Sequence, residues 1–217
     1  MLFSNESLAL WINENFEPVW ESVRPVPVVR VNFGGGHQVT RTLHGNTATY
    51  VCNADGHVID ILPGVYSRAE YRRQLSTIVD LAAACRGQEK RELQATLAAY
   101  HRTEYWKRPP LEEGSVPFAS KRVVERPVEE AITGRPKGGS GNGGRTADPF
   151  PHLATDDRAN EERRRPLIHG QLRYGQLVPP EELTDWLYRT VLETDLRDPL
   201  LGLGPMLVGS DPFERTR

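Results

Sequence analysis

Apolar residues in the first hundred positions recur at two spacings, one typical of helices and one typical of strands. The helical spacing predicts a helix over residues 4–15 with Ser4 as its N-cap. Two longer helices are predicted over residues 67–84, where Ser67 can serve as N-cap, and over residues 89–106. All three are amphipathic, so each is expected to bury one face.

Alternating apolar and polar residues predict the strands. Residues 27–43 read as a hairpin that turns at the three glycines of residues 34–36. Residues 47–52 and 58–62 read as two further strands with a polar turn between them. A short strand is also predicted over residues 16–20, at a sheet edge or strand end because Pro18 has no backbone N–H.

The pattern changes after residue 107. Prolines interrupt residues 108–165, and glycines dominate residues 138–144, so we predict a largely disordered linker there. Order is expected to return near Pro166, with a helix that begins at Pro180. This helical C-terminal element carries too much apolar surface to remain detached, so it is expected to pack on the first part of the chain. Its large apolar residues are Trp186, Leu187, Leu200, Leu201, Leu203 and Leu207.

Composition excludes several classes of protein. A net charge of −2 gives no reason to expect binding to nucleic acid or to a membrane surface. The chain contains no run of 18 apolar residues, and residues 1–15 do not have the pattern of a signal peptide, so a cytoplasmic protein is predicted. The two cysteines and six histidines have none of the short spacings of metal sites, so no metal or other cofactor is expected.

Cys52 is the residue to consider first for chemistry. It ends an apolar strand, and we interpret it as a buried, inert side chain. The alternative is a reactive thiol, but the sequence places neither a helix N-terminus nor a basic residue beside it. Cys85 lies next to Arg86, whose charge favours a thiolate, but the helix C-terminus opposes one.

The remaining candidates are surface residues. His44 is interpreted as a loop side chain, and Trp20, Arg24 and His37 are possible lining residues of a surface groove. The charged run over residues 161–165 has mixed sign and is interpreted as a solvated helix start.

The order of elements over residues 47–84 resembles the C-terminal half of thioredoxins. Two strands joined by the Asp55-Gly56 turn are followed by Pro63-Gly64 and an amphipathic helix. Residues 3–19 likewise resemble the segment after the active site of bacterial thioredoxin-like proteins, where a helix ends in an Asn-Glu-x-Phe motif. The resemblance covers about residues 1–84. Together with the helix over 89–106, it implies an α/β, partly thioredoxin-like domain over residues 1–106. The linker over 107–165 and the helical element over 166–217 follow this domain.

The family's Cys-x-x-Cys motif is absent from the sequence. We therefore expect a redox-inactive protein with a structural or protein-interaction role, and we assign no catalytic or cofactor-binding residue. The alternative is the remnant of a thiol-disulfide oxidoreductase whose motif lies upstream of Met1. In thioredoxins a central strand leads into that motif. Without it, the strands at 16–20 and 47–52 lack their shared neighbour, so a protein partner or self-association, or else a marginally stable chain, is expected. The alternative is that the hairpin at 27–43 fills the gap.

Overall fold

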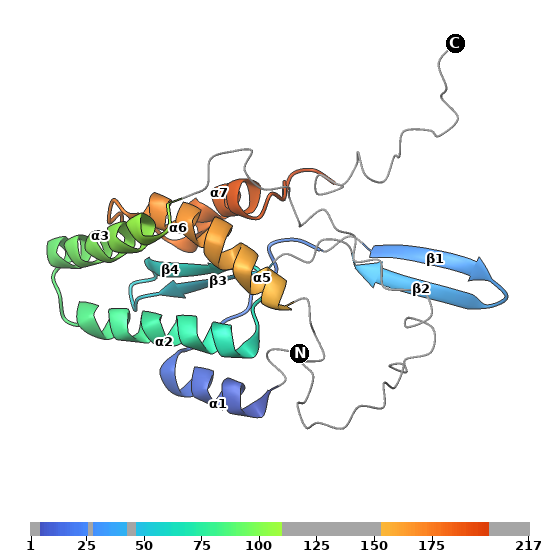
Figure 1. Cartoon of the computed structure of the whole chain (residues 1–217), viewed down its shortest axis with the longest axis horizontal. Helices are drawn as coiled ribbons and strands as arrows, with labels where there is room; N and C mark the ends of the chain where they lie inside the picture. Colours follow the sequence, from blue (N-terminus) through green and yellow to red (C-terminus); the bar gives the residue numbers. More distant parts are fainter. Residues whose placement is uncertain (1–4, 26–27, 43–46, 110–152, 200–217) are drawn as a thin grey trace, which may run out of the picture. The chain divides into compact units, whose positions relative to one another are not determined.

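The computed structural model describes residues 5–25, 28–42, 47–109 and 153–199. These residues belong to one compact unit, formed by residues 1–110 and 152–217, whereas residues 111–151 form a second unit. The described part has a mixed α/β fold (Figure 1). Its elements, with η marking π-helical segments, are α1 Glu6–Asn15, β1 Val28–Gly34, β2 His37–Thr42, β3 Ala48–Cys52, β4 Val58–Pro63, α2 Arg68–Cys85, α3 Lys90–Lys107, α5 Leu153–Ala159, η2 Asn160–Arg164, α6 Arg165–Leu172, α7 Pro180–Trp186 and η3 Leu187–Val191.

The helices predicted near residues 67–84 and 89–106 are confirmed as α2 and α3. Ser67 caps α2 by accepting a hydrogen bond from the Glu70 N–H at 3.3 Å. The N-cap predicted for the first helix is wrong, because Asn5 caps α1 by accepting from the Leu8 N–H at 2.9 Å. Ser4 lies outside the described residues. None of the described helices is long and apolar enough to cross a lipid bilayer.

Each of the two predicted pairs of strands forms an antiparallel sheet of its own. β1 pairs with β2, and β3 pairs with β4. In the second pair Tyr50 lies opposite Ile61 and Val51 opposite Asp60, and a bulge follows because Cys52 pairs with Val58. The strand predicted at residues 16–20 is wrong, since no strand forms there. Pro18 cannot donate to a ladder, and Val19 and Trp20 are exposed rather than packed.

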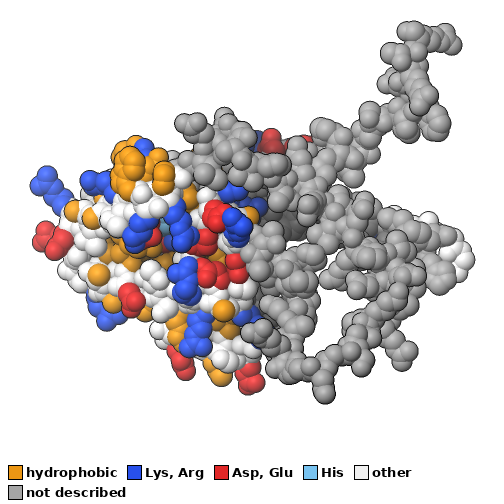
Figure 2. All heavy atoms as spheres, in the orientation of Figure 1, with side chains coloured by type: hydrophobic (Ala, Val, Ile, Leu, Met, Phe, Trp, Pro, Cys, Tyr) orange, Lys and Arg blue, Asp and Glu red, His pale blue; other side chains and the backbone are white. Residues whose placement is uncertain are grey.

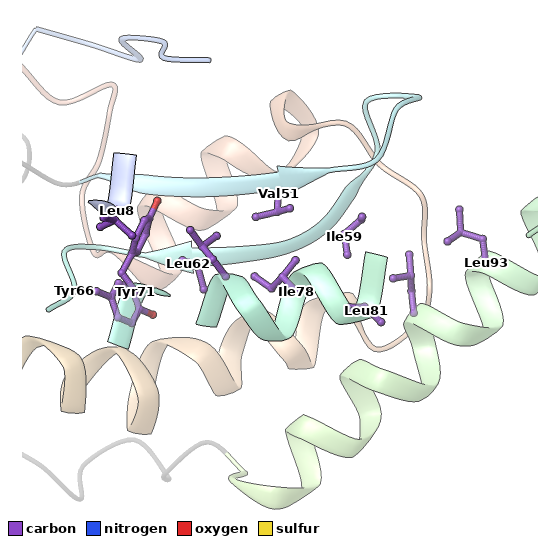
Figure 3. Close-up of a cluster of buried hydrophobic side chains, with 11 residues drawn as sticks. Leu8, Val51, Ile59, Leu62, Tyr66, Tyr71, Ile78, Leu81 and Leu93 are labelled. Carbon is purple, nitrogen blue, oxygen red and sulfur yellow. The ribbon is translucent and has the colours of Figure 1, made fainter. Parts of the chain in front are cut away.

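Two hydrophobic cores lie on either side of β4, which is buried along its whole length. One core joins Ile59 and Leu62 to α2, with α1 and α3 at its margins (Figure 3). The other core joins Val58 and Ile61 to the C-terminal helices α6, α7 and η3. The expectation that the C-terminal element packs on the first part of the chain is therefore confirmed for its described residues. Burial of each large side chain there contributes roughly 1.5–3 kcal/mol. Leu200, Leu201, Leu203 and Leu207 lie outside the described part of the chain.

The chain is helical from Leu153 to Leu172 through α5, η2 and α6. The prediction of irregular structure up to Arg165 is therefore wrong for residues 153–165. The apolar stripe of this helical segment is interrupted, because Asn160 and Arg165 are polar yet buried. In the sequence, the segment therefore looks like a polar stretch exposed to solvent. The other residues of the predicted linker, 110–152, lie outside the described part of the chain.

Candidate functional site

Polar side chains from three elements meet at the edge of β4 that faces away from β3. Asp60 comes from β4, Tyr100 and His101 come from α3, and Arg165 and His169 come from α6. All but Tyr100 are buried: Asp60 is 0%, His101 1%, Arg165 4% and His169 5% exposed. Ionisable groups at this depth are stable only when they are paired and hydrogen-bonded, so their contacts define the site.

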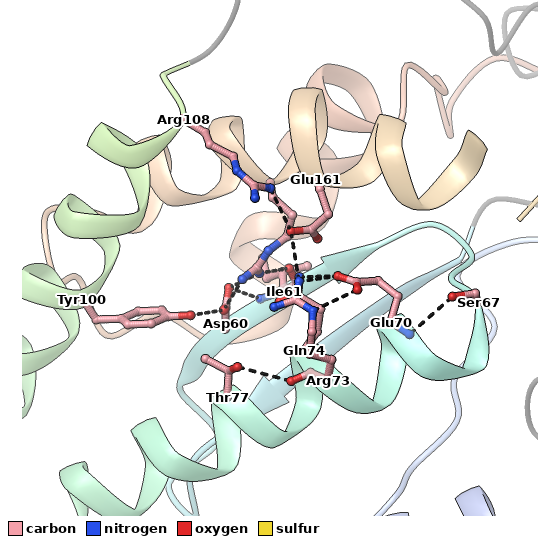
Figure 4. A network of polar contacts seen from close by, with 11 residues as sticks. Asp60, Ile61, Ser67, Glu70, Arg73, Gln74, Thr77, Tyr100, Arg108 and Glu161 are labelled. Atoms are coloured by element: carbon pink, nitrogen blue, oxygen red, sulfur yellow. Dashed lines mark hydrogen bonds and ion pairs between the residues drawn. The ribbon is translucent and has the colours of Figure 1, made fainter. Parts of the chain in front are cut away.

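Arg165 and Asp60 form a bidentate ion pair. The two guanidinium nitrogens donate to Asp60 Oδ1 at 2.6 Å and to Oδ2 at 2.8 Å, and the Tyr100 hydroxyl donates to Oδ2 at 3.4 Å (Figure 4). Burial alone would raise the pKa of Asp60, but the charge of Arg165 outweighs it and holds that pKa below its usual range. Asp60 is therefore a carboxylate, and Arg165 is its permanent counter-ion.

The same side chains bind the backbone of β4. Asp60 Oδ1 accepts from the Ile61 N–H at 2.8 Å, and Arg165 donates to the Ile61 carbonyl at 2.8 Å. His101 Nε2 lies 2.9 Å from the Ile59 carbonyl, and the Val58 N–H donates to the Val178 carbonyl at 2.9 Å. Buried backbone groups require partners. Three side chains and the Val178 carbonyl thus satisfy an edge that a neighbouring strand would otherwise cover.

His101 and His169 contact each other through their Nδ1 atoms at 2.9 Å. The Ile59 carbonyl can only accept, so His101 Nε2 carries a proton. Burial lowers the pKa of His101, which is therefore neutral, and its Nδ1 accepts from His169 Nδ1–H. Burial, together with the charge of Arg165, lowers the pKa of His169 to about 3. The His169 ring is consequently neutral and has an unprotonated Nε2.

Asp60, His101 and His169 each offer a ligand atom, and these three atoms lie within 4.8 Å of one another. Their surroundings do not fit a divalent cation. Both carboxylate oxygens of Asp60 already accept from Arg165, and both nitrogens of His101 are hydrogen-bonded. A metal ion would also lie beside the Arg165 charge, which no change of protonation can remove. We therefore assign the cluster to closing the strand edge rather than to metal binding.

A pocket of about 350 Å³ lies over this cluster. Arg73 Nη2 from α2 and Arg108 Nη1, at the end of α3, lie 3.7 and 3.6 Å from the same oxygen, Glu161 Oε2. Glu161 Oε1 is buried and has no hydrogen-bond partner among the described residues, and burial raises the pKa of this carboxyl. The pocket is lined by Arg73, Gln74, Thr77, Tyr100, Glu104, Lys107, Arg108, Glu161, Arg165, Pro166 and His169.

The thiols predicted from the sequence lie elsewhere. Cys52 is exposed at the last position of β3, so its interpretation as a buried side chain is wrong. Cys85 is half-buried, and both thiols are free. Partial desolvation raises the pKa of both, and the negative charge of Glu181 adds to the effect at Cys52. A raised pKa disfavours the thiolate that a reactive cysteine requires.

The other sequence candidates do not form a common site in the described residues. Trp20 is exposed, and Arg24 donates to the carbonyls of Leu196 at 2.8 Å and Pro199 at 3.0 Å. His44 and the side chain of His37 lie outside the described part of the structure. The charged run over residues 161–165 is not a solvated helix start, since Arg165 is buried.

Sequence reasoning missed the cluster at β4, although one signal was present. Asp60 stands in the middle of an apolar strand, and a buried carboxylate there requires a cationic partner. No spacing in the sequence identifies Arg165, which lies 105 residues away, as that partner. The two histidines belong to different helices and are 68 residues apart.

Comparison with known proteins adds no relative. The chain matches no protein family, no curated protein and no solved structure.

Proposed function

We propose that the chain is a non-catalytic protein with a partial thioredoxin-like arrangement, and that it binds an extended segment of a protein partner along the outer edge of β3. The order of β3, β4 and α2, with α2 packed on one face of the hairpin, supports the thioredoxin-like part of the proposal. The edge of β3 supports the interaction role, because an open strand edge is a template for another strand.

The direction of the backbone groups in β3 is the observation that carries this proposal. The Ile61 N–H and C=O are bound by the side chains of Asp60 and Arg165, so they point away from β3. Tyr50 lies opposite Ile61, and its own N–H and C=O must then point away from β4. By the same alternation, those of Ala48 also point outward. Within the described residues, β3 pairs with β4 alone.

The two edges of the hairpin therefore differ. Side chains close the edge of β4, whereas no described side chain hydrogen-bonds to the outward backbone groups of β3. Ala48, Thr49 and Tyr50 are half-buried, so water reaches this edge only in part. A partner in extended conformation would supply the missing backbone hydrogen bonds. Since these bonds are formed by the main chain, the edge should select a partner by its extended conformation more than by its sequence.

Amide hydrogen exchange on the full chain tests the premise. The Tyr50 amide should exchange much faster than the Val51 amide, because the latter faces Asp60 in the ladder. Peptides selected from a random library for binding to the full chain should then slow exchange at Tyr50. Cys52→Lys places a charge at this edge and should weaken the binding of these peptides. Ala83→Lys, on the exposed side of α2, should leave their binding unchanged.

Two results would contradict the proposal. One is a Tyr50 amide that, in a monomer without peptide, exchanges as slowly as the Val51 amide. That result would mean that another part of the same chain already pairs with the edge. The other is a dimer, seen by light scattering, in which Tyr50 is protected. That result would assign the edge to a second copy of the chain in place of a partner.

A further inference from the structure

We propose that the pocket between α2, α3 and η2 binds a phosphate group. The pocket lies on the β4 side of the hairpin, away from the β3 edge, so this proposal does not depend on the one above. Four cationic side chains line it, against two acidic ones, Glu104 and Glu161. Its volume of about 350 Å³ is at the small end of the range for ligand pockets and suits a compact group.

Two guanidinium groups converge in this pocket. Arg73 and Arg108 belong to different helices, yet both approach Glu161 Oε2 (Figure 4). Their distances of 3.7 and 3.6 Å exceed those of hydrogen bonds, so neither guanidinium is held by a hydrogen bond to this oxygen. Both arginine side chains are 58% exposed, which leaves them accessible to a ligand.

Other ion pairs account for the remaining charges. Arg165 is neutralised by Asp60, Lys107 pairs with Glu104 at 2.6 Å, and Arg73 also pairs with Glu70. Among the described residues, Arg108 forms an ion pair with Glu161 alone. Arg108 is therefore the cation with the most capacity to bind an incoming anion.

The arrangement of donors favours a tetrahedral oxyanion over a carboxylate. Arg73, Gln74 and Thr77 approach from α2, Lys107 and Arg108 from the end of α3, and Arg165 from the floor. A carboxylate has two coplanar oxygens and can meet two of these directions, whereas a phosphate group presents oxygens to all three. Arginine binds phosphate in a bidentate manner. Charged residues also gather on the described surface in Figure 2, but the pocket differs from an ordinary charged surface because its floor is buried.

Glu161 competes with the ligand for the same guanidinium groups. Burial disfavours the charged form of its carboxyl, and Oε1 has no hydrogen-bond partner among the described residues. A phosphate group would displace it or bind beside its protonated form. Loss of the Glu161 charge should therefore strengthen binding, whereas loss of the Arg108 charge should weaken it. A general effect of net charge would give the same two signs, so a matched charge change elsewhere on α3 is needed to separate the two.

Isothermal titration of the full chain with inorganic phosphate, at constant ionic strength, tests the proposal. Arg108→Gln should weaken binding about tenfold, the loss expected for one charge-assisted hydrogen bond. Arg91→Gln makes the same charge change near the other end of α3 and should leave affinity unchanged. Glu161→Gln should strengthen binding several-fold. Thermal melts establish that each variant is folded.

A second titration with glycerol phosphate distinguishes two sources of the same group. Tighter binding of the monoester would assign the pocket to a phosphorylated molecule, and tighter binding of inorganic phosphate to the free ion. Three results would overturn the proposal: no saturable heat with either phosphate, equal binding of acetate, or an equal loss of affinity in Arg91→Gln and Arg108→Gln.

Discussion

Arg165 binds both carboxylate oxygens of Asp60 and, through one of the same nitrogens, also the backbone carbonyl of Ile61. Asp60 in turn accepts from the Ile61 N–H. An ordinary buried ion pair can often be replaced by apolar residues with no loss of stability. This pair differs, because its removal also deprives two buried backbone groups of their partners. The ion pair therefore also serves as the hydrogen-bond partner of the outer edge of β4.

We predict that Asp60→Leu/Arg165→Leu is less stable than the parent chain. Both backbone groups of Ile61 lose their partners, and each buried unsatisfied group costs about 1–3 kcal/mol. Asp60→Leu alone should cost about 3–5 kcal/mol, because it leaves the buried guanidinium unpaired. Urea unfolding measures both. The exposed pair Arg158–Glu162 is the control, and its double replacement by alanine should have little effect. A double variant at residues 60 and 165 that equals the parent in stability would show that the pair does not close the strand edge.

The two buried histidines predict a loss of stability in mild acid. Their pKa values are lowered in the folded chain, so in the unfolded chain, with a pKa near 6.5, they bind protons more readily. The unfolded state thus gains protons first as pH falls. The free energy of unfolding should decrease below about pH 6.5, by up to about 1.4 kcal/mol per pH unit for each histidine. For His169 the decrease should continue to its folded pKa of about 3.

His169→Asn tests this origin of the pH dependence. The asparagine amide can replace the Nδ1 donor to His101, but it does not titrate. Chemical unfolding at pH 7 and pH 5 should therefore show a smaller decrease in this variant than in the parent chain. An equal decrease in both would exclude His169. The lowered pKa of Asp60 adds a further loss only below its ordinary value of about 3.9.

Local rules predicted the elements that have clear caps and periodicity. Ser67 and the apolar stripe of α2 identified that helix to within a residue, and the alternation in β3 and β4 identified the hairpin. The same rules failed at residues 153–165, because buried Asn160 and Arg165 break the apolar pattern that marks a buried helix. They also failed at Phe16–Trp20, where strand-forming residues have no ladder to join.

The candidate site could not be predicted, because its contacts link distant parts of the sequence. Asp60 indicates that a partner exists, but any of the many arginines could supply it. The tautomers of His101 and His169 depend on the Ile59 carbonyl, whose direction is set by the β-ladder and not by local sequence. The pocket depends on Arg73, Arg108 and Glu161 meeting from three helices, and each of these residues alone resembles a solvated surface charge.

We predict that the chain does not accelerate the reduction of insulin by dithiothreitol. Its two thiols are not in a Cys-x-x-Cys motif, and the pKa of each is raised, which reduces the thiolate fraction at neutral pH. Turbidity should develop as it does in buffer alone. An acceleration that disappears in Cys52→Ser but persists in Cys85→Ser would identify Cys52 as a reactive thiol and favour the reading of the chain as an oxidoreductase remnant.

Gly175 offers a test of how closely α6 approaches α3. This residue follows α6 with φ +68°, and a Cβ on it would lie 2.3 Å from the Gln94 carbonyl oxygen of α3. Gly87 also has a positive φ, +74°, but a Cβ there would meet nothing within 4 Å. Gly87→Ala should therefore cost only the strain of the left-handed conformation, about 1–2 kcal/mol.

Gly175→Ala should cost roughly 1–3 kcal/mol more than Gly87→Ala, because α3 and α6 must also move apart. Urea unfolding of the two variants measures the difference. The separation of the helices should also disturb the contact between His101 and His169, which come from these same two helices. The pH dependence of stability should then weaken in Gly175→Ala and not in Gly87→Ala. Equal stability and equal pH dependence in the two variants would mean that the turn after α6 does not hold the helices at this distance.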